Sequence, residues 1–270
     1  MIWARVMAPL SGGEADRHVV AAAAALAEPF GAELAAVHAP PDVADLIPWM
    51  GDGFMGGVQA SAVDAIREAA SEGAKAANAV VESCPYGKKS FKTLPSPVWA
   101  ALALQSRLSD VVVFDDAAAK SKGPLAEVFQ QIVADEQRPT LVARPGFKVG
   151  GIVAVAWDGG KEASRAVRTA IPLLEKASKV VILTAPAAAS RQFDPSGLQA
   201  YLDARGLKSE IQTLDGAGDA APRLLKTAVE IGADLMVAGA FGHPRLQEFV
   251  FGGVTRTFLT AAAPSMFISH

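Results

Sequence analysis

The sequence predicts an α/β protein made of two tandem, doubly wound domains. Two observations support this fold class. Apolar runs of four to six residues alternate with Ala-rich helical stretches along the whole chain, and such runs without polar alternation are typical of strands buried on both faces of a parallel sheet. The order of these segments in the first half also recurs in the second half, as expected of an internal duplication.

The duplication is clearest where each half begins. Residues 6–15 and 153–163 each contain an apolar run, a polar residue and two glycines before a helical segment. The other matched segments are 34–40 with 180–186, 110–115 with 234–239, and 139–144 with 264–269. Alternating strands and helices predict βαβ units with right-handed crossovers. We therefore expect domains at 1–146 and 150–270, separated where Pro and paired Gly interrupt both patterns.

Helices are expected between the strands from apolar spacing and from start and stop signals. The expected ranges are 15–28, 58–83, 97–108, 162–176, 222–231 and 254–262. Pro172 should kink its helix or lie in the last turn. Residues 40–57 are rich in Gly, Pro and Met and have no counterpart in the second half. They are predicted to form a surface loop, with a lid or a contact surface as the alternative.

Composition limits the classes of function. The 270 residues carry a formal net charge of −3, which argues against nucleic acid or an anionic membrane as partner. Cys84 is the only cysteine, so an internal disulfide is impossible and a reducing compartment is favoured. The first residues lack the charged and apolar regions of a secretion signal. A cytoplasmic protein is therefore expected.

Four glycines surround a short insert directly after the apolar run 234–238. They are Gly239, Gly242, Gly252 and Gly253. Open parallel sheets bind ligands outside the carboxyl ends of their strands, and glycine-rich backbone beside a helix N-terminus offers N–H groups that suit phosphate. The spacing fits neither the P-loop nor the dinucleotide-binding pattern. The alternative is that these glycines only form turns.

The pattern Gly239-x2-Gly242-x9-Gly252-Gly253-Val254-Thr255 resembles the nucleotide-binding signature of the universal stress protein family, Gly-x2-Gly-x9-Gly-Ser/Thr. The first and last strands of the second half fit the family as well, and the first half matches in plan, so the whole chain resembles a tandem member. The resemblance implies two Rossmann-like domains, similar to the adenine nucleotide α-hydrolases, each with a five-stranded parallel sheet of order 3-2-1-4-5.

The resemblance also implies ATP as ligand of the second half, with Mg²⁺ bound through its phosphates. Asp158 would hold the ribose or the adenine side, and the backbone of Ala185 would meet the adenine edge. The residues expected around the phosphates are Gly239, Gly242, His243, Gly252, Gly253, Val254 and Thr255. Asp158 could instead cap the next helix, and His243 could be a solvated loop residue.

Gly253 departs from the signature, which has a hydroxyl residue at this position. One hydrogen bond to phosphate is therefore missing, which weakens binding about tenfold by affinity arithmetic. The first half departs further: Ser11, Asp115 and Glu127–Val128 stand at the positions of Asp158, Gly239 and Gly252–Gly253. Carboxylates repel phosphate, and a β-branched residue resists the left-handed backbone. We expect no nucleotide in the first half.

Two functions stay open. One is a stress-responsive, ATP-binding regulatory protein whose nucleotide alters a surface for an unknown protein partner. The other is a tandem protein that binds no nucleotide and acts through protein contacts or another small ligand. No metal-ligand spacing or nucleophile pattern is present, so at most slow ATP hydrolysis is expected. An ATP-using enzyme of the α-hydrolase group would need a catalytic element that the sequence does not supply.

Assembly is also implied by the resemblance, because the last strands of two such domains pair antiparallel. In this chain residues 141–143 and 266–268 can pair within one molecule and cover both exposed strand edges. A homodimer is the alternative assembly.

Overall fold

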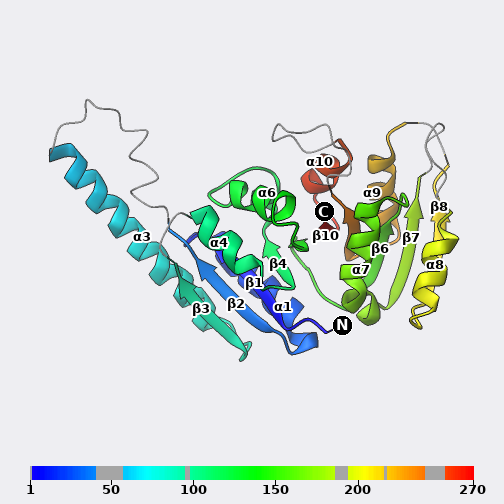
Figure 1. Ribbon diagram of the computed structural model, residues 1–270, viewed down its shortest axis with the longest axis horizontal. Coiled ribbons are helices and arrows are strands. Elements are labelled where there is room, and N and C mark those ends of the chain that lie inside the picture. Colours follow the sequence, from blue (N-terminus) through cyan, green and yellow to red (C-terminus); the bar gives the residue numbers. More distant parts are fainter. Residues whose placement is uncertain (1, 41–56, 95–97, 186–193, 216–217, 241–252) are drawn as a thin grey trace.

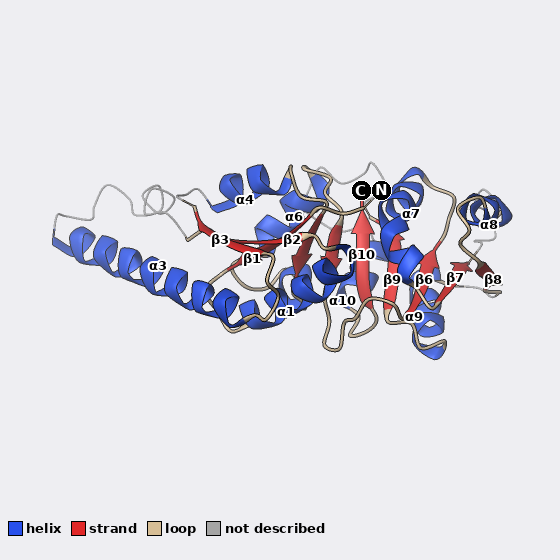
Figure 2. Ribbon diagram, turned by 90° about the horizontal axis from the view of Figure 1, so that it is seen from below, coloured by secondary structure: helices blue, strands red, loops and turns tan. Residues whose placement is uncertain are grey.

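A computed structural model describes residues 2–40, 57–94, 98–185, 194–215, 218–240 and 253–270. One ten-stranded sheet runs through the molecule, with helices packed on it (Figures 1 and 2). The strands are β1 (Arg5–Leu10), β2 (Glu33–His38), β3 (Lys89–Thr93), β4 (Val111–Phe114), β5 (Thr140–Val142), β6 (Ile152–Ala156), β7 (Lys179–Thr184), β8 (Ser209–Thr213), β9 (Leu235–Gly239) and β10 (Ser265–Ser269).

The helices lie between the strands in sequence. They are α1 (Ala15–Ala27), the short 3-10 helix η1 (Glu28–Phe30), α3 (Gly57–Ser83), α4 (Val98–Ser106), α5 (Asp116–Ala119), α6 (Ala126–Ala134), α7 (Lys161–Lys176), α8 (Ser196–Asp203), α9 (Ala220–Glu230) and α10 (Gly253–Thr260). Helix α7 continues past Pro172, which lies near its end. Helix α3 extends well beyond the sheet (Figure 1). None of the described helices is both long and apolar enough to cross a bilayer.

The strand order is β3-β2-β1-β4-β5-β10-β9-β6-β7-β8. Neighbouring strands are parallel within each half, whereas β5 and β10 are antiparallel, with Leu141 opposite Phe267. The expected pairing of the last strands within one molecule is therefore present. The prediction of a five-stranded sheet for each half needs correction in one respect. The β5–β10 pair hydrogen-bonds two otherwise exposed edges, so the strands of both halves form one ten-stranded sheet.

Side chains alternate between two apolar layers on opposite faces of the sheet. In β1, Val6, Ala8 and Leu10 join one cluster with residues of α1, α3, α7 and α8. Met7 joins the other, with residues of α4, α5, α6, α9 and α10. Successive strand side chains point to opposite faces, so covering both faces explains the nearly unbroken apolar runs of the central strands.

The outermost strands, β3 and β8, were not predicted from the sequence. Each has one neighbouring strand, and both show half-buried residues alternating with exposed ones. Their sequences, KSFKT and SEIQT, contain no apolar run, since an edge strand needs fewer buried side chains. Helices α5, α6 and α8 were not predicted either.

Candidate functional site

The order of the strands reverses beside β6, which lies between β7 and β9. Register pairs Ala156 of β6 with Leu183 of β7, and Val155 with Val237 of β9. The carboxyl ends of the three strands therefore meet at one edge, the usual place for a ligand in a doubly wound sheet. Asp158 and Ala185 follow β6 and β7 at this edge, and Gly239 ends β9.

Asp158 is exposed, and its Oδ1 atom accepts a hydrogen bond of 2.8 Å from the N–H of Gly160. Between them Gly159 has a φ of 72°, a left-handed conformation that glycine adopts without strain. The N-cap of α7 is Gly160, which makes no side-chain capping bond. The alternative in which Asp158 caps α7 is therefore wrong: the carboxylate holds the turn and faces solvent at the sheet edge.

Gly239 has a packing role. A Cβ atom at this position would lie 2.5 Å from the N atom of Ala163 and 2.8 Å from the Cβ of Glu162. The end of β9 thus contacts the backbone of the first turn of α7, and only glycine permits this approach. The presence of Gly239 is explained by this contact without any ligand.

The first turn of α10 contains the other described signature residues. Gly253 and Val254 are exposed, and Thr255 is buried. Among the residues that the structure describes, none would lie within 4 Å of a Cβ atom on Gly253, so none of them requires the absence of a side chain there. The first N–H groups of a helix lack intrahelical acceptors and favour anions. Gly242, His243 and Gly252 lie outside the described residues.

Two residues near this edge were missed from the sequence. Glu162 is only 7% exposed, and its Oε1 lies 3.4 Å from the Nζ of Lys161. The Nδ1 of His270 lies 3.1 Å from the carbonyl O of Ala240; burial lowers the pKa of His270, and the charge of Glu162 opposes this shift. No pattern marks Glu162, because an acidic residue in a first helical turn is common.

The equivalent edge of the first half is filled by the protein itself. Asp16 is 1% exposed and accepts hydrogen bonds from the N–H groups of Ser11 (2.9 Å) and Gly12 (2.8 Å). Gly12 has a φ of 80°, similar to that of Gly159. The duplication places Ala163 at the position of Asp16, so the second half has no carboxylate at this position.

Helix α3 closes the same edge from outside. A Cβ atom on Gly12 would lie 2.5 Å from the Cα of Gly73, and one on Gly73 would lie 3.3 Å from the Nε2 of His38. His38 ends β2, whose counterpart β7 leads to Ala185. In the first half α3 thus covers the sheet edge whose counterpart in the second half was expected to hold adenine.

The lost signature position Asp115 also has a structural role in the first half. Its carboxylate is the N-cap of α5 and accepts a bond of 3.0 Å from the N–H of Ala118. Repulsion of phosphate by carboxylates is one reason to expect no nucleotide in the first half. The structure adds a second reason. Asp16 already binds the N–H groups of Ser11 and Gly12, and α3 occupies the space beside Gly12.

Comparisons with known proteins agree with this architecture. A model described as the universal stress protein family matches residues 151–268. A universal stress protein from Archaeoglobus fulgidus DSM 4304 has a TM-score of 0.69 and 13% identity, over 98% of this chain and 95% of that one. A putative universal stress protein from Pseudomonas aeruginosa UCBPP-PA14 has a TM-score of 0.56 and 13% identity, over 99% and 93%.

The cytoplasmic domain of a prokaryotic cation chloride cotransporter shares the fold as well, with a TM-score of 0.51 and 14% identity over 99% of this chain and 96% of that one. No curated protein matches the sequence. At such identities the structures establish a common fold only. The family model, in addition, matches the sequence of the second half. Residues 151–268 match the universal stress protein family model, and the whole length of the chain shares its fold with a solved universal stress protein.

Proposed function

We propose that this protein binds an adenine nucleotide, ATP in the first instance, in its second half alone and acts as a stress-responsive regulator. One contrast carries the proposal. The end of β1 is filled by the carboxylate of Asp16 and covered at Gly73 of α3, whereas the equivalent end of β6 presents the exposed carboxylate of Asp158.

The chemistry of the described residues suits such a ligand. A carboxylate accepts hydrogen bonds from sugar hydroxyls and is a poor neighbour for phosphate, which assigns Asp158 to the ribose. The first turn of α10, with Gly253 and Val254 exposed, suits phosphate oxygens. No group of three or more His, Cys, Asp or Glu within the described ranges is suited to hold a metal, so Mg²⁺ would enter on the phosphates. Binding with at most slow hydrolysis is the proposed activity.

A protein-contact function is the second candidate, and one observation favours it. The buried carboxylate of Glu162 adjoins Gly239, and its charge opposes a polyphosphate at this edge. In this alternative the second half binds no nucleotide, and α10 with its neighbours forms part of a surface for another protein.

Calorimetric titration with ATP, ADP and AMP decides between the two. The Asp158→Asn variant keeps an oxygen that can accept from Gly160, so the turn should survive while the charge is lost. Wild type should bind ATP more tightly than 2′-deoxy-ATP, and the variant should bind ATP about tenfold more weakly with little preference between the two. Absence of binding by wild type at millimolar nucleotide would leave the protein-contact function.

A further inference from the structure

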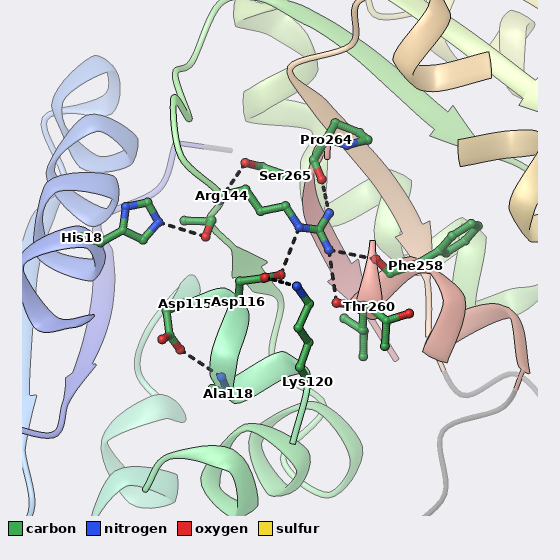
Figure 3. A network of polar contacts seen from close by, with 12 residues as sticks. His18, Asp115, Asp116, Ala118, Lys120, Arg144, Phe258, Thr260, Pro264 and Ser265 are labelled. Atoms are coloured by element: carbon green, nitrogen blue, oxygen red, sulfur yellow. Dashed lines mark hydrogen bonds and ion pairs between the residues drawn. The ribbon is translucent and has the colours of Figure 1, made fainter. Parts of the chain in front are cut away.

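The guanidinium of Arg144 crosses from the first half of the chain to the second. Arg144 follows β5, and its side chain is 3% exposed. Its Nε donates to Oδ1 of Asp116 (3.2 Å), its Nη1 to the carbonyl of Pro264, and its Nη2 to the carbonyls of Phe258 (2.9 Å) and Leu259 (3.2 Å). Figure 3 shows the planar group between Asp116 and the end of α10.

These contacts cap the C-terminal end of α10, which ends at Thr260. The last carbonyls of a helix have no intrahelical donor and carry the negative end of the helix dipole. A guanidinium satisfies several of them at once and supplies the complementary charge, which a lysine ammonium does less well because it lacks the planar fork. The end of α10 is thus held by a residue of the other half.

Asp116 completes the arrangement from α5. It bonds Arg144 through Oδ1 and Lys120 through Oδ2, and α5 packs beside α10. It directly follows Asp115, which stands at the position of Gly239. The part of the first half that lost the signature therefore supports a helix of the second half.

The support acts in one direction only. The duplication aligns Arg144 with Ser269. Helix α6 is the first-half counterpart of α10, and a serine has no guanidinium with which to bind the carbonyls at its end. The carbonyl of Ile132 in α6 is instead bonded by the backbone N–H of Arg138. The guanidinium clamp is therefore found at the helix whose first turn carries Gly253, Val254 and Thr255.

We propose that Arg144, held by Asp116, is a positioning residue for the ligand site: by fixing the C-terminal end of α10 it fixes the first-turn amides of Gly253–Thr255 at the other end. A helix of eight residues is about 12 Å long and rigid, so restraint at one end orients the other. Through this contact the first half sets the affinity of the second. The ligand part of the inference rests on the proposed function.

The experiment combines hydrogen exchange with ATP titration on the full chain. Arg144→Gln should make the amides of residues 256–260 exchange about tenfold faster than in wild type and should raise the Kd for ATP about tenfold, since the buried carbonyls lose their donors. Arg144→Lys should give a smaller change in both. Asp116→Asn, which leaves the guanidinium in place, should act in the same direction and serves if Arg144→Gln does not fold.

Two control variants separate this role from general destabilisation. Arg107→Gln removes a guanidinium that forks onto Glu136 with two bonds of 2.7 Å at the exposed surface, and both readouts should match wild type. Val81→Ala removes buried methyl groups from α3 and so destabilises the core of the first half. Helix α3 follows β2, which is separated from β10 by β1, β4 and β5 in the sheet. The Val81→Ala substitution should lower the free energy of unfolding without a selective effect on α10 or on the Kd.

Unchanged exchange in α10 of folded Arg144→Gln would overturn the clamp. Faster exchange with an unchanged Kd would overturn the positioning role. If wild type binds no ATP, the proposed function fails together with the ligand part of the inference, while the exchange measurements still decide whether Arg144 holds α10.

Discussion

The backbone of Gly12 lies directly against that of Gly73: a Cβ atom on Gly12 would be 2.5 Å from the Cα of Gly73 and 2.8 Å from its carbonyl O. Gly12 lies in the turn after β1, and Gly73 lies in the 27-residue helix α3. Two residues without side chains thus allow a helix to cover the ligand edge of the first half. The two halves share a fold, but this contact makes their edges different.

Replacement of Gly12 by alanine should therefore be costly. The added methyl group meets the backbone of α3 and must also adopt a φ of 80°, so the free energy of unfolding should fall by about 2–4 kcal/mol. Gly31→Ala is the matched control, since Gly31 has a φ of 60° but no described residue within 4 Å of a Cβ atom; its free energy of unfolding should fall by only about 1 kcal/mol. Urea unfolding measures both, and equal losses would contradict the contact with α3.

A serine at position 253 should restore the missing hydroxyl. Gly253 is not in the left-handed region, and no described residue would lie within 4 Å of a Cβ atom there, so Gly253→Ser should fold as wild type does. It should bind ATP about tenfold more tightly, because a hydrogen bond to a charged acceptor is gained. Gly253→Ala adds the same carbon without the oxygen and should not tighten binding. Equal affinities of the serine and alanine variants would show that phosphate does not contact this position.

Acid should destabilise the protein through His38. Burial lowers the pKa of this histidine from 6.5, and the charge of Asp16 and a carbonyl of Ser11 oppose the shift only in part; its Nδ1 has no partner within the described chain. The unfolded chain takes up a proton near pH 6.5 that the folded chain does not. The stabilisation is therefore complete above that pH and is lost as the pH falls towards the folded-state pKa.

His38→Thr, which installs the residue of the second half at this position, tests the effect. Urea unfolding at about pH 7.5, 6.5 and 5.5 should give a shallower fall in the free energy of unfolding for the variant than for wild type. Burial also lowers the pKa of His270. Part of the decrease in the free energy of unfolding at low pH should therefore persist in both proteins. A pH-independent difference between the two proteins would exclude titration of His38 as the cause.

Separation of the halves should expose a strand edge. Met266, Phe267 and Ile268 of β10 are at most 1% exposed, and β5 covers one side of this strand. A fragment of residues 150–270 should therefore dimerise through β10, since an unpaired apolar edge recruits another strand. Light scattering after gel filtration measures its mass beside that of the full chain. A fragment that stays monomeric at micromolar concentration would show that the half protects this edge by itself.

Local patterns explain most of the fold that could be predicted. The central strands are apolar throughout because they are buried on both faces. The repeated order of segments indicates the duplication from the sequence alone. The edge strands β3 and β8 were not predicted, because strands with half-exposed residues, such as KSFKT, contain no apolar run. Hydrophobic periodicity reports burial, and these strands are only partly buried.

The candidate site was predictable only in part. Gly253 belongs to the glycine signature and Asp158 follows from the family resemblance; in the structure Asp158 comes directly after β6, and Gly253 begins α10. Gly239 belongs to the same signature but is required by its contact with α7. Asp16, Glu162 and Arg144 carry no local signal, because each acts through neighbours brought to it by the fold.

The sequence by itself determined the α/β class and the duplication, since these follow from local spacing and composition. It also determined which half carries the glycine pattern that resembles the family signature. Only the tertiary structure decided that α3 and Asp16 close the first edge, and that Arg144 caps a helix 114 residues further along the chain. The reason is physical: such contacts join segments that become neighbours only when the sheet forms, so no short stretch of sequence encodes them.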